Sequence, residues 1–188
     1  MYPRPVSRTE KSAFDRAVAA LARRALSTGE LRLRLARAGH AREEIDAALR
    51  RLVELQLVDD QAVAYNHARS RAASGRRGPA RVRAELAARG IRGADAEGAV
   101  AAAFDAEGVA AAAAQAFARC SRGMSRPLAA PERAKVAARL ARAGFPAAMI
   151  RSLLASEGAR EAADELLLDG IDDGSAEDEP GVLRDAED

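Results

Sequence analysis

The pentapeptide Leu35-Ala36-Arg37-Ala38-Gly39 occurs again, letter for letter, at Leu140 to Gly144, and the near copy LAARG occupies Leu86 to Gly90. The three glycines are 51 and 54 residues apart. In each copy an apolar residue lies eight positions before the glycine and a leucine lies four before it, and this i, i+4 spacing is typical of the buried side of a short helix. The repeat therefore predicts one helix that recurs three times.

Helix start and stop signals surround each copy. Ser27-Thr28-Gly29-Glu30 fits a capping box. Pro79 and Pro131 suit the first position of a helix, because proline has no amide proton to leave unpaired there. Each copy ends at a glycine, the residue that best tolerates the left-handed backbone of a helix C-terminal cap. We therefore expect short helices that end at these glycines.

Two further helical patterns accompany each copy of the repeat. The apolar stripe before the first copy consists of Phe14, Val18, Leu21 and Ala25. The segments 60–74 and 105–122, each closed by a glycine, precede the other two copies. The pattern after the first copy consists of Ile45, Leu49, Leu52 and Val53. The unit is therefore three helices in roughly 50 residues.

Composition favours an all-α chain. Aromatic residues make up only 3% of the 188 residues, whereas alanine, leucine and arginine, which are good helix formers, dominate. A unit of this size buries little apolar surface alone, so we expect the repeats to stack into an elongated, curved array. The predicted segments are an N-terminal extension at 1–10, three-helix repeats at 11–57, 58–104 and 105–156, and an acidic, mostly disordered tail at 157–188.

Positive and negative charges are separated along the chain. Residues 1–156 contain 28 Arg and Lys against 15 Asp and Glu, a balance of +13, whereas residues 157–188 contain 2 against 13, a balance of −11. A basic body of this size indicates a polyanionic partner, or a protein complex that contains one. The acidic tail either competes with that partner for the basic body or only increases solubility, and both interpretations stay open.

The densest group of basic residues spans a helix end, a linker and the next helix start. Its members are Arg69, Arg71, Arg76, Arg77, Arg81 and Arg83. Guanidinium groups placed this closely can converge on phosphates or on acidic groups of a protein filament, although a solvated helix face would give the same pattern. A secondary basic surface is expected opposite the apolar pairs of the first and third copies. It consists of Arg34, Arg37, Arg139 and Arg142.

The sequence offers little that an enzyme would use. His40 and His67 are the only histidines, and neither has a second ligand at metal spacing, so no zinc site is expected; a phosphate contact by His67 stays open. The stretch Gly75 to Pro79 lacks the ending of a nucleotide-binding loop and is interpreted as a flexible, basic linker. The pair Asp59-Asp60 lies at a helix start, where capping is a better explanation than catalysis. We expect a binding protein with no catalytic residue, cofactor, metal or small-molecule substrate.

The chain shows no feature of an exported or membrane-bound protein. It has no run of about 18 apolar residues, and its first residues, MYPRPVSRTEK, lack the apolar centre of a signal peptide. A single cysteine, Cys120, cannot form an internal disulfide. We therefore expect a cytoplasmic protein, a monomer, without membrane contact.

The string from Leu52 to Ile91 resembles the central segment of the bacterial RecX family. The shared elements are, in order, Asp59-Asp60, a helix ending in Ser70-Arg71, Gly78-Pro79, the Arg-apolar-Arg-x-Glu-Leu pattern at Arg81 to Leu86, and Gly90-Ile91. The resemblance extends over residues 11–156. Three positions depart from the family pattern: Gln56-Leu57 stand where a glycine and an aromatic residue are usual, Gln61-Ala62 where an arginine and an aromatic residue are usual, and Arg77 where an aromatic residue often precedes Gly-Pro.

The resemblance implies tandem three-helix repeats, which agrees with the periodicity. It also implies a regulator that binds along the groove of the RecA filament on single-stranded DNA and restrains the recombinase, ATPase and coprotease functions of RecA, within homologous recombination, DNA repair and the SOS response. It implies no catalysis. The alternative is a sequence-nonspecific nucleic-acid-binding protein that contacts the DNA backbone, since the scarcity of aromatic residues argues against stacking on single strands.

Overall fold

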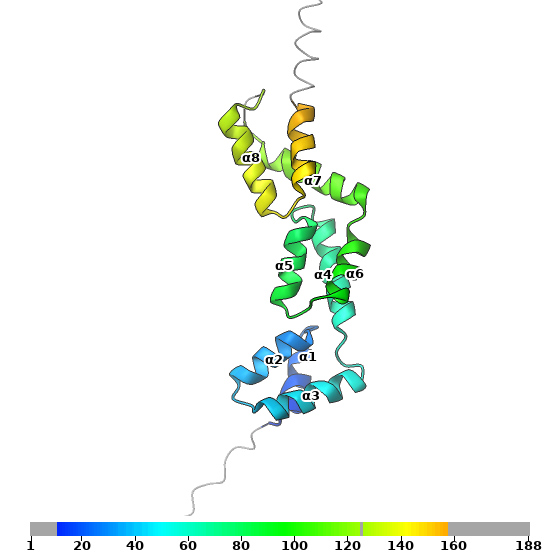
Figure 1. Ribbon diagram of the computed structural model, residues 1–188. Coiled ribbons are helices and arrows are strands. Elements are labelled where there is room, and N and C mark those ends of the chain that lie inside the picture. Colours follow the sequence, from blue (N-terminus) through cyan, green and yellow to red (C-terminus); the bar gives the residue numbers. More distant parts are fainter. Residues whose placement is uncertain (1–10, 125, 158–188) are drawn as a thin grey trace, which may run out of the picture.

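The structure is a computed structural model that describes residues 11–124 and 126–157. Within these ranges every regular element is a helix, and the helices follow one another along an elongated molecule (Figure 1). They form three successive groups of three. The predicted all-α array of tandem three-helix repeats is thus confirmed.

Each repeat contains its three helices in the same order. The first repeat consists of α1 (Ala13–Leu21), α2 (Thr28–Arg37) and α3 (Arg42–Glu54). The second consists of α4 (Asp60–Ala73), α5 (Pro79–Ala88) and α6 (Ala94–Ala103). The third consists of α7 (Ala106–Cys120), α8 (Ala130–Arg142) and a last helix at 147–157. The second helices, α2, α5 and α8, lie on the same side of the molecule (Figure 1).

Each repeat has a hydrophobic cluster centred on the residues that define the sequence repeat. The six members of the i, i+4 pairs are 0–1% exposed: Leu31, Leu35, Val82, Leu86, Val136 and Leu140. Residues from the flanking helices, such as Ile45 and Leu49 of α3, pack around the first pair. The spacing therefore identifies the buried side of the second helix in all three repeats.

The first helix is rotated from its predicted orientation. The predicted stripe consists of Phe14, Val18, Leu21 and Ala25, of which Phe14 and Leu21 are partly buried against the first core and the other two are not. Val18 is 37% exposed and Ala25 is exposed. Helix α1 instead buries Ala13, Ala17 and Ala20, whose small side chains let it pack closely against α3.

The glycine after each second helix adopts a left-handed backbone, with φ of 87° at Gly39, 84° at Gly90 and 88° at Gly144. At each end the glycine N–H bonds to the carbonyl three positions earlier, and the next N–H bonds to the carbonyl of the repeat leucine, as in Ile91 N–H to Leu86 O at 3.0 Å. This pair of bonds is a Schellman motif, which satisfies two of the last helical carbonyls. The predicted helix stop is confirmed in all three repeats.

The first two repeats meet end to end through their second helices. We term this contact joint 1; it brings the start of α2, Ser27 to Gly29, onto the end of α5, Arg89 and Gly90. The buried Ser27 hydroxyl accepts a hydrogen bond from Glu30 N–H as the cap of α2 and donates to the Arg89 carbonyl at 2.6 Å. A β-carbon on Gly29 would stand only 2.7 Å from Gly90 Cα. Joint 1 therefore has no room for a side chain at Gly29.

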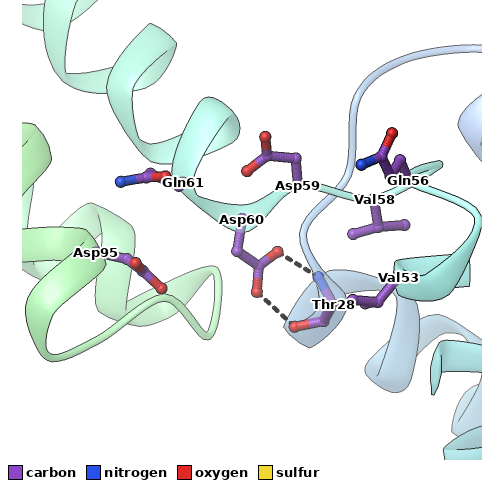
Figure 2. A pocket seen from close by; sticks show the side chains of 8 residues that line it. All are labelled: Thr28, Val53, Gln56, Val58, Asp59, Asp60, Gln61 and Asp95. Atoms are coloured by element: carbon purple, nitrogen blue, oxygen red, sulfur yellow. Dashed lines mark hydrogen bonds between the residues drawn. The ribbon is translucent and has the colours of Figure 1, made fainter.

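Asp60 contributes a carboxylate to joint 1 (Figure 2). Its two oxygens accept hydrogen bonds from Thr28 N–H at 2.8 Å and from Thr28 Oγ1 at 2.5 Å. Asp59 instead caps its own helix, α4, by accepting from Ala62 N–H at 2.9 Å. The predicted capping role is thus confirmed for Asp59, whereas Asp60 caps the second helix of the preceding repeat.

Joint 2 repeats the arrangement between the start of α5 and the end of α8. Gly78 N–H donates to the Ala143 carbonyl at 2.8 Å, and Ala80 N–H donates to the Gly144 carbonyl at 3.2 Å. The start of a helix has unpaired N–H groups and its end has unpaired carbonyls, so two helix ends in this contact satisfy each other. Gly90 and Gly144 therefore serve both as helix stops and as docking surfaces for the preceding repeat.

The segment from Gly75 to Pro79 is held by the third repeat. Arg119 of α7 donates a hydrogen bond to the Gly75 carbonyl, and Gly78 lies in joint 2. Both glycines are buried. The prediction of a flexible linker is therefore wrong, because its backbone groups are bonded to a neighbouring repeat that local sequence does not reveal.

The two joints differ in the apolar contacts beside them. Val109 of α7 belongs to the core of the second repeat, and Met149 packs against the cores of both the second and the third. The core of the first repeat contains only residues between 13 and 58. Beside joint 1 lies an open cleft whose lining includes Asp59, Asp60 and Asp95 (Figure 2). Among the described residues, joint 1 thus depends on polar and backbone contacts.

Two predicted segments lie outside the described residues, the extension at 1–10 and the acidic tail after 157. Glu157 itself lies in the last helix and forms an ion pair with Arg126. Across the described ranges, no helix combines the length and apolar character needed to cross a membrane.

Candidate partner-binding site

Three arginines and a histidine gather around the carboxylate of Glu85. His67 Nε2 lies 3.0 Å from Glu85 Oε2, and Arg71 Nε donates to the same oxygen at 2.9 Å. Arg77 Nε and Arg81 Nε lie 3.6 Å and 3.7 Å from Glu85 Oε1. We term these five residues the Glu85 cluster.

Helical spacing explains why these side chains meet. His67 and Arg71 are four positions apart on α4, and Arg81 and Glu85 are four positions apart on α5, so each pair shares one helix face. Helices α4 and α5 pack against each other, and Arg77 comes from the segment that joint 2 holds in place. The side chain of Glu85 is 18% exposed and contacts residues from all three segments.

The surroundings of Glu85 favour its charged form. Burial of the carboxyl opposes ionisation, but the hydrogen bond from His67 and the charge and hydrogen bond of Arg71 outweigh it, so the pKa of Glu85 lies below its ordinary value. Glu85 is therefore a stable counter-charge for the arginines around it.

The three arginines approach Glu85 through the same atom. In each case Nε is the nitrogen closest to the carboxylate. The terminal nitrogens of Arg71, Arg77 and Arg81 make no hydrogen bond to another group within 11–124 and 126–157, and the three side chains are 46%, 42% and 49% exposed. Their terminal N–H groups can therefore donate to an external anion while Nε stays with Glu85.

Three of the six arginines predicted as the main site meet at Glu85, and the other three do not. Those in the Glu85 cluster are Arg71, Arg77 and Arg81. Arg83 instead pairs with Glu97 at 2.8 Å. Arg69 and Arg76 are exposed, and neither has an ion-pair partner in the described part of the chain. Because Arg69 and Arg71 are two positions apart on a helix, they point to nearly opposite sides of α4.

The secondary basic surface is spread over the two outer repeats. Arg34 and Arg37 are exposed on α2, and Arg139 and Arg142 are exposed on α8. The second repeat lies between these two helices (Figure 1). The structure therefore separates the four arginines into two pairs, one on α2 and one on α8.

Sequence reasoning missed Glu85 as the centre of the site. The signal was present, because an acidic residue stands four positions after Arg81 within a basic stretch. His67, for which a phosphate contact was left open, is 11% exposed and lies against Glu85 instead. In the portion of the chain that the structure describes, no three His, Cys, Asp or Glu side chains are placed to hold a metal ion.

These features define an all-helical repeat protein with an organised group of arginines suited to anionic groups. The family models for the first and the second three-helix domain of RecX match residues 13–52 and 59–100. "Regulatory protein RecX" of Chromohalobacter salexigens is 41% identical over 86 residues, which are 46% of this chain and 56% of that protein. The match therefore spans little more than half of that relative.

Two solved structures share the fold. A crystal structure of regulatory protein RecX superposes with a TM-score of 0.69 at 22% identity, over 77% of this chain and 70% of the other. RecX from Lactobacillus salivarius gives a TM-score of 0.68 at 16% identity, over 78% of this chain and 95% of the other. The chain is thus similar to RecX proteins in sequence over its first two three-helix repeats and shares their fold, and the relative from Chromohalobacter salexigens is named a regulatory protein.

Proposed function

We propose that this chain is a regulatory binding protein that inhibits the RecA recombinase by binding the RecA filament on single-stranded DNA. Similarity to the RecX family carries the proposal, because relatives of this chain are named as regulatory proteins. The proposed mechanism needs no catalytic residue. The proposed active form is a monomer in the cytoplasm.

The Glu85 cluster is the proposed main contact surface. Three guanidinium groups against one carboxylate leave two positive charges in excess when His67 is neutral. A carboxylate or phosphate on the partner can accept paired N–H groups from such arginines in a bidentate geometry, which a lysine does not offer. Arg76 and Arg83 are proposed to extend this surface, and Arg69 is proposed as a separate contact on another side of α4.

We propose that binding is shared among the repeats at 11–57, 58–104 and 105–156. The outer repeats contribute the secondary basic surface, which consists of Arg34, Arg37, Arg139 and Arg142. Several weak contacts made at the same time give a higher total affinity than any one of them, provided that their spacing matches the partner. The regular order of the second helices along one side of the molecule supports this arrangement (Figure 1).

A sequence-nonspecific nucleic-acid binder is the second candidate. The same terminal N–H groups of Arg71, Arg77 and Arg81 would fit the phosphates of a DNA backbone. This alternative differs in one measurable respect, since a DNA binder acts on RecA only by competing for DNA.

The rate of ATP hydrolysis by RecA on single-stranded DNA separates the two candidates. We expect the chain to inhibit at concentrations below that of RecA, and the inhibition to persist when excess single-stranded DNA is added. Inhibition that disappears with excess DNA would favour the nucleic-acid binder, and absence of any effect would reject the RecA proposal.

The contact surface is tested by charge-matched variants. Replacing Arg71, Arg77 and Arg81 together by glutamine should raise the half-inhibitory concentration roughly tenfold or more, since charge-assisted hydrogen bonds are lost. The control replaces Arg16, Arg23 and Arg151, which are exposed and lie away from the cluster, and changes the net charge equally. Equal effects of the two triple variants would show that overall charge, and not the cluster, determines binding.

A further inference from the structure

Joint 1 fixes the first repeat against the second mainly through backbone atoms and short side chains, beside one longer ion pair in which Arg89 Nε lies 3.9 Å from Glu30 Oε1. Ser27 bonds to the Arg89 carbonyl, Thr28 bonds twice to Asp60, and the Gly29 backbone lies on the Gly90 backbone. Short side chains have few rotamers, so such contacts define an angle at a small cost in conformational entropy. A tight contact of backbone on backbone also leaves little freedom to slide.

The angle at joint 1 depends on these contacts because a shared core is lacking there. The apolar cluster of the first repeat contains no residue after Val58, and an open cleft lies beside the joint, lined by Val53 and Val58 on the side of the first repeat and otherwise by polar side chains. At joint 2, by contrast, Val109 and Met149 tie the second and third repeats together. A change in joint 1 is thus expected to alter the path of the array and to leave each core intact.

A fixed path matters for one kind of partner. A polymer with regular helical order presents equivalent sites at fixed spacing, and only an array of matching path can occupy several of them at once. A flexible single strand can adjust its own shape to the protein, so it does not require a fixed path. The two kinds of partner should therefore respond differently to a disturbed joint.

We propose that joint 1 is a specificity determinant: by fixing the path of α2 relative to α5, it directs the array to an ordered helical polymer in preference to a flexible strand. This proposal rests on the proposed function, in which that polymer is the RecA filament. The residues that carry the determinant are Ser27, Thr28, Gly29, Asp60, Arg89 and Gly90.

Gly29→Ala is the most direct test, because it places a methyl group against the backbone of Arg89 and Gly90. Alanine is the better helix former, so α2 and its repeat should remain folded. Gly98→Ala is the matched control: Gly98 lies within α6, and a β-carbon there would meet no atom within 4 Å. Thr28→Val is a second variant, which removes the hydroxyl bond to Asp60 with little change in volume.

The geometry of joint 1 is measured by pulsed electron–electron double resonance, which gives the distribution of distances between two spin labels. Spin labels are placed at Leu33→Cys and Ala84→Cys, two exposed positions on α2 and α5, in a Cys120→Ser background. We expect the distance distribution to shift or broaden in Gly29→Ala and Thr28→Val and to remain unchanged in Gly98→Ala. An unchanged distribution in both joint variants would overturn the proposal.

Selectivity is measured by two titrations with unlabelled proteins. We expect Gly29→Ala to raise the half-inhibitory concentration in the RecA ATPase assay about tenfold or more, because simultaneous contacts are lost. Its affinity for a free oligothymidylate strand should stay at the level of the wild type and of Gly98→Ala.

Two results would overturn the proposal even if the distance changes. One is RecA inhibition by Gly29→Ala equal to that of the wild type, and the other is an equal loss of affinity for the filament and for the free strand. Failure of the wild-type chain to inhibit RecA would instead reject the proposed function, and the proposal about selectivity would be rejected with it. The spin-label comparison would still decide whether joint 1 sets the angle between the first two repeats.

Discussion

The Glu85 carboxylate determines how the arginines around it are held. Arg71, Arg77 and Arg81 carry like charges that would repel one another, and each is nearly half exposed. A partly buried carboxylate that contacts all three offsets this repulsion and restricts the side chains before a partner arrives. Restricting them in advance lowers the entropy that binding must remove.

Replacing Glu85 by glutamine should lower the free energy of unfolding at neutral pH by about 1–2 kcal/mol, since hydrogen bonds to a charged group are lost. The pKa of Glu85 is lowered in the folded state. Its carboxylate therefore stabilises the fold above the unfolded-state pKa of about 4.3, and this contribution is lost as pH falls through the folded-state pKa. Urea unfolding of both proteins should show a difference that shrinks below about pH 4.

The control for this prediction is Glu97→Gln. Glu97 also pairs with an arginine, Arg83, but its side chain is 60% exposed, so the change should have a smaller effect. A stability difference between the wild type and Glu85→Gln that stays constant with pH would contradict the assigned role of the Glu85 charge.

His40 occupies a position that is apolar in the other two repeats. It follows Gly39 as Ile91 follows Gly90, and its side chain is 13% exposed with Nε2 buried and without a hydrogen-bond partner among the described residues. An unpaired buried polar atom costs about 1–3 kcal/mol. His40→Leu should therefore raise the melting temperature measured by calorimetry. A lower melting temperature would show that His40 Nε2 has a hydrogen-bond partner, such as a water molecule, in solution.

Residues whose roles are local could be predicted from the sequence. The Ser27 cap and the Asp59 cap follow from rules that involve three or four neighbouring positions, and both are present. The second bond of Ser27 and the bond of Asp60 to Thr28 could not be predicted, because their partners lie in another repeat. For the same reason, the sequence did not show that Arg69 lies apart from the arginines that contact Glu85.

At the scale of the element, helix α4 begins with two aspartates that serve different helices. Asp59→Ala removes the cap of α4 and should lower stability by about 1 kcal/mol without changing the distance between labels on α2 and α5. Asp60→Ala removes two bonds to Thr28 and should change that distance. Thermal unfolding and the spin-label measurement together test the division, and a change of distance in Asp59→Ala would contradict it.

Helix ends were easier to predict than helix orientations. Glycine and proline mark the ends of α2, α5 and α8 because their backbone restrictions act at one position. The orientation of α1 could not be predicted from hydrophobicity, since the pairing with α3 selects the small Ala17 over the larger Val18. Gly29, inside the first turn of a helix, is unfavourable by propensity alone, and its reason is the close approach of Gly90.

At the scale of the whole molecule, the presence of one apolar cluster in each repeat implies stability that varies along the chain. Leu31→Ala leaves a cavity in the first core and should cost about 2–5 kcal/mol there. In a repeat protein such a loss acts mainly on its own repeat and its neighbour. Hydrogen exchange followed by mass spectrometry should therefore show faster exchange in α1 to α3 and little change in α7 and α8.

Leu140→Ala is the reciprocal control, since it should accelerate hydrogen exchange in the third repeat and leave exchange in the first repeat unchanged. A uniform increase along the chain in either variant would show that the repeats unfold as one cooperative unit.

The two outer ends of the array do not complement each other. The end of α2 at Gly39 has no neighbour within 4 Å of a β-carbon placed there. Helix α8 begins six residues before Val136, whereas α2 and α5 begin three residues before Leu31 and Val82. The additional residues at the start of α8 occupy the position at which the C-terminal glycine of another second helix would dock. A contact that joins unlike surfaces builds open-ended fibres when it can repeat between molecules. The end of α2 in one copy cannot dock on the start of α8 in another. Neighbouring copies bound to a long partner should therefore not recruit one another through this contact. The occupancy of the partner should follow the free concentration of the chain without cooperativity.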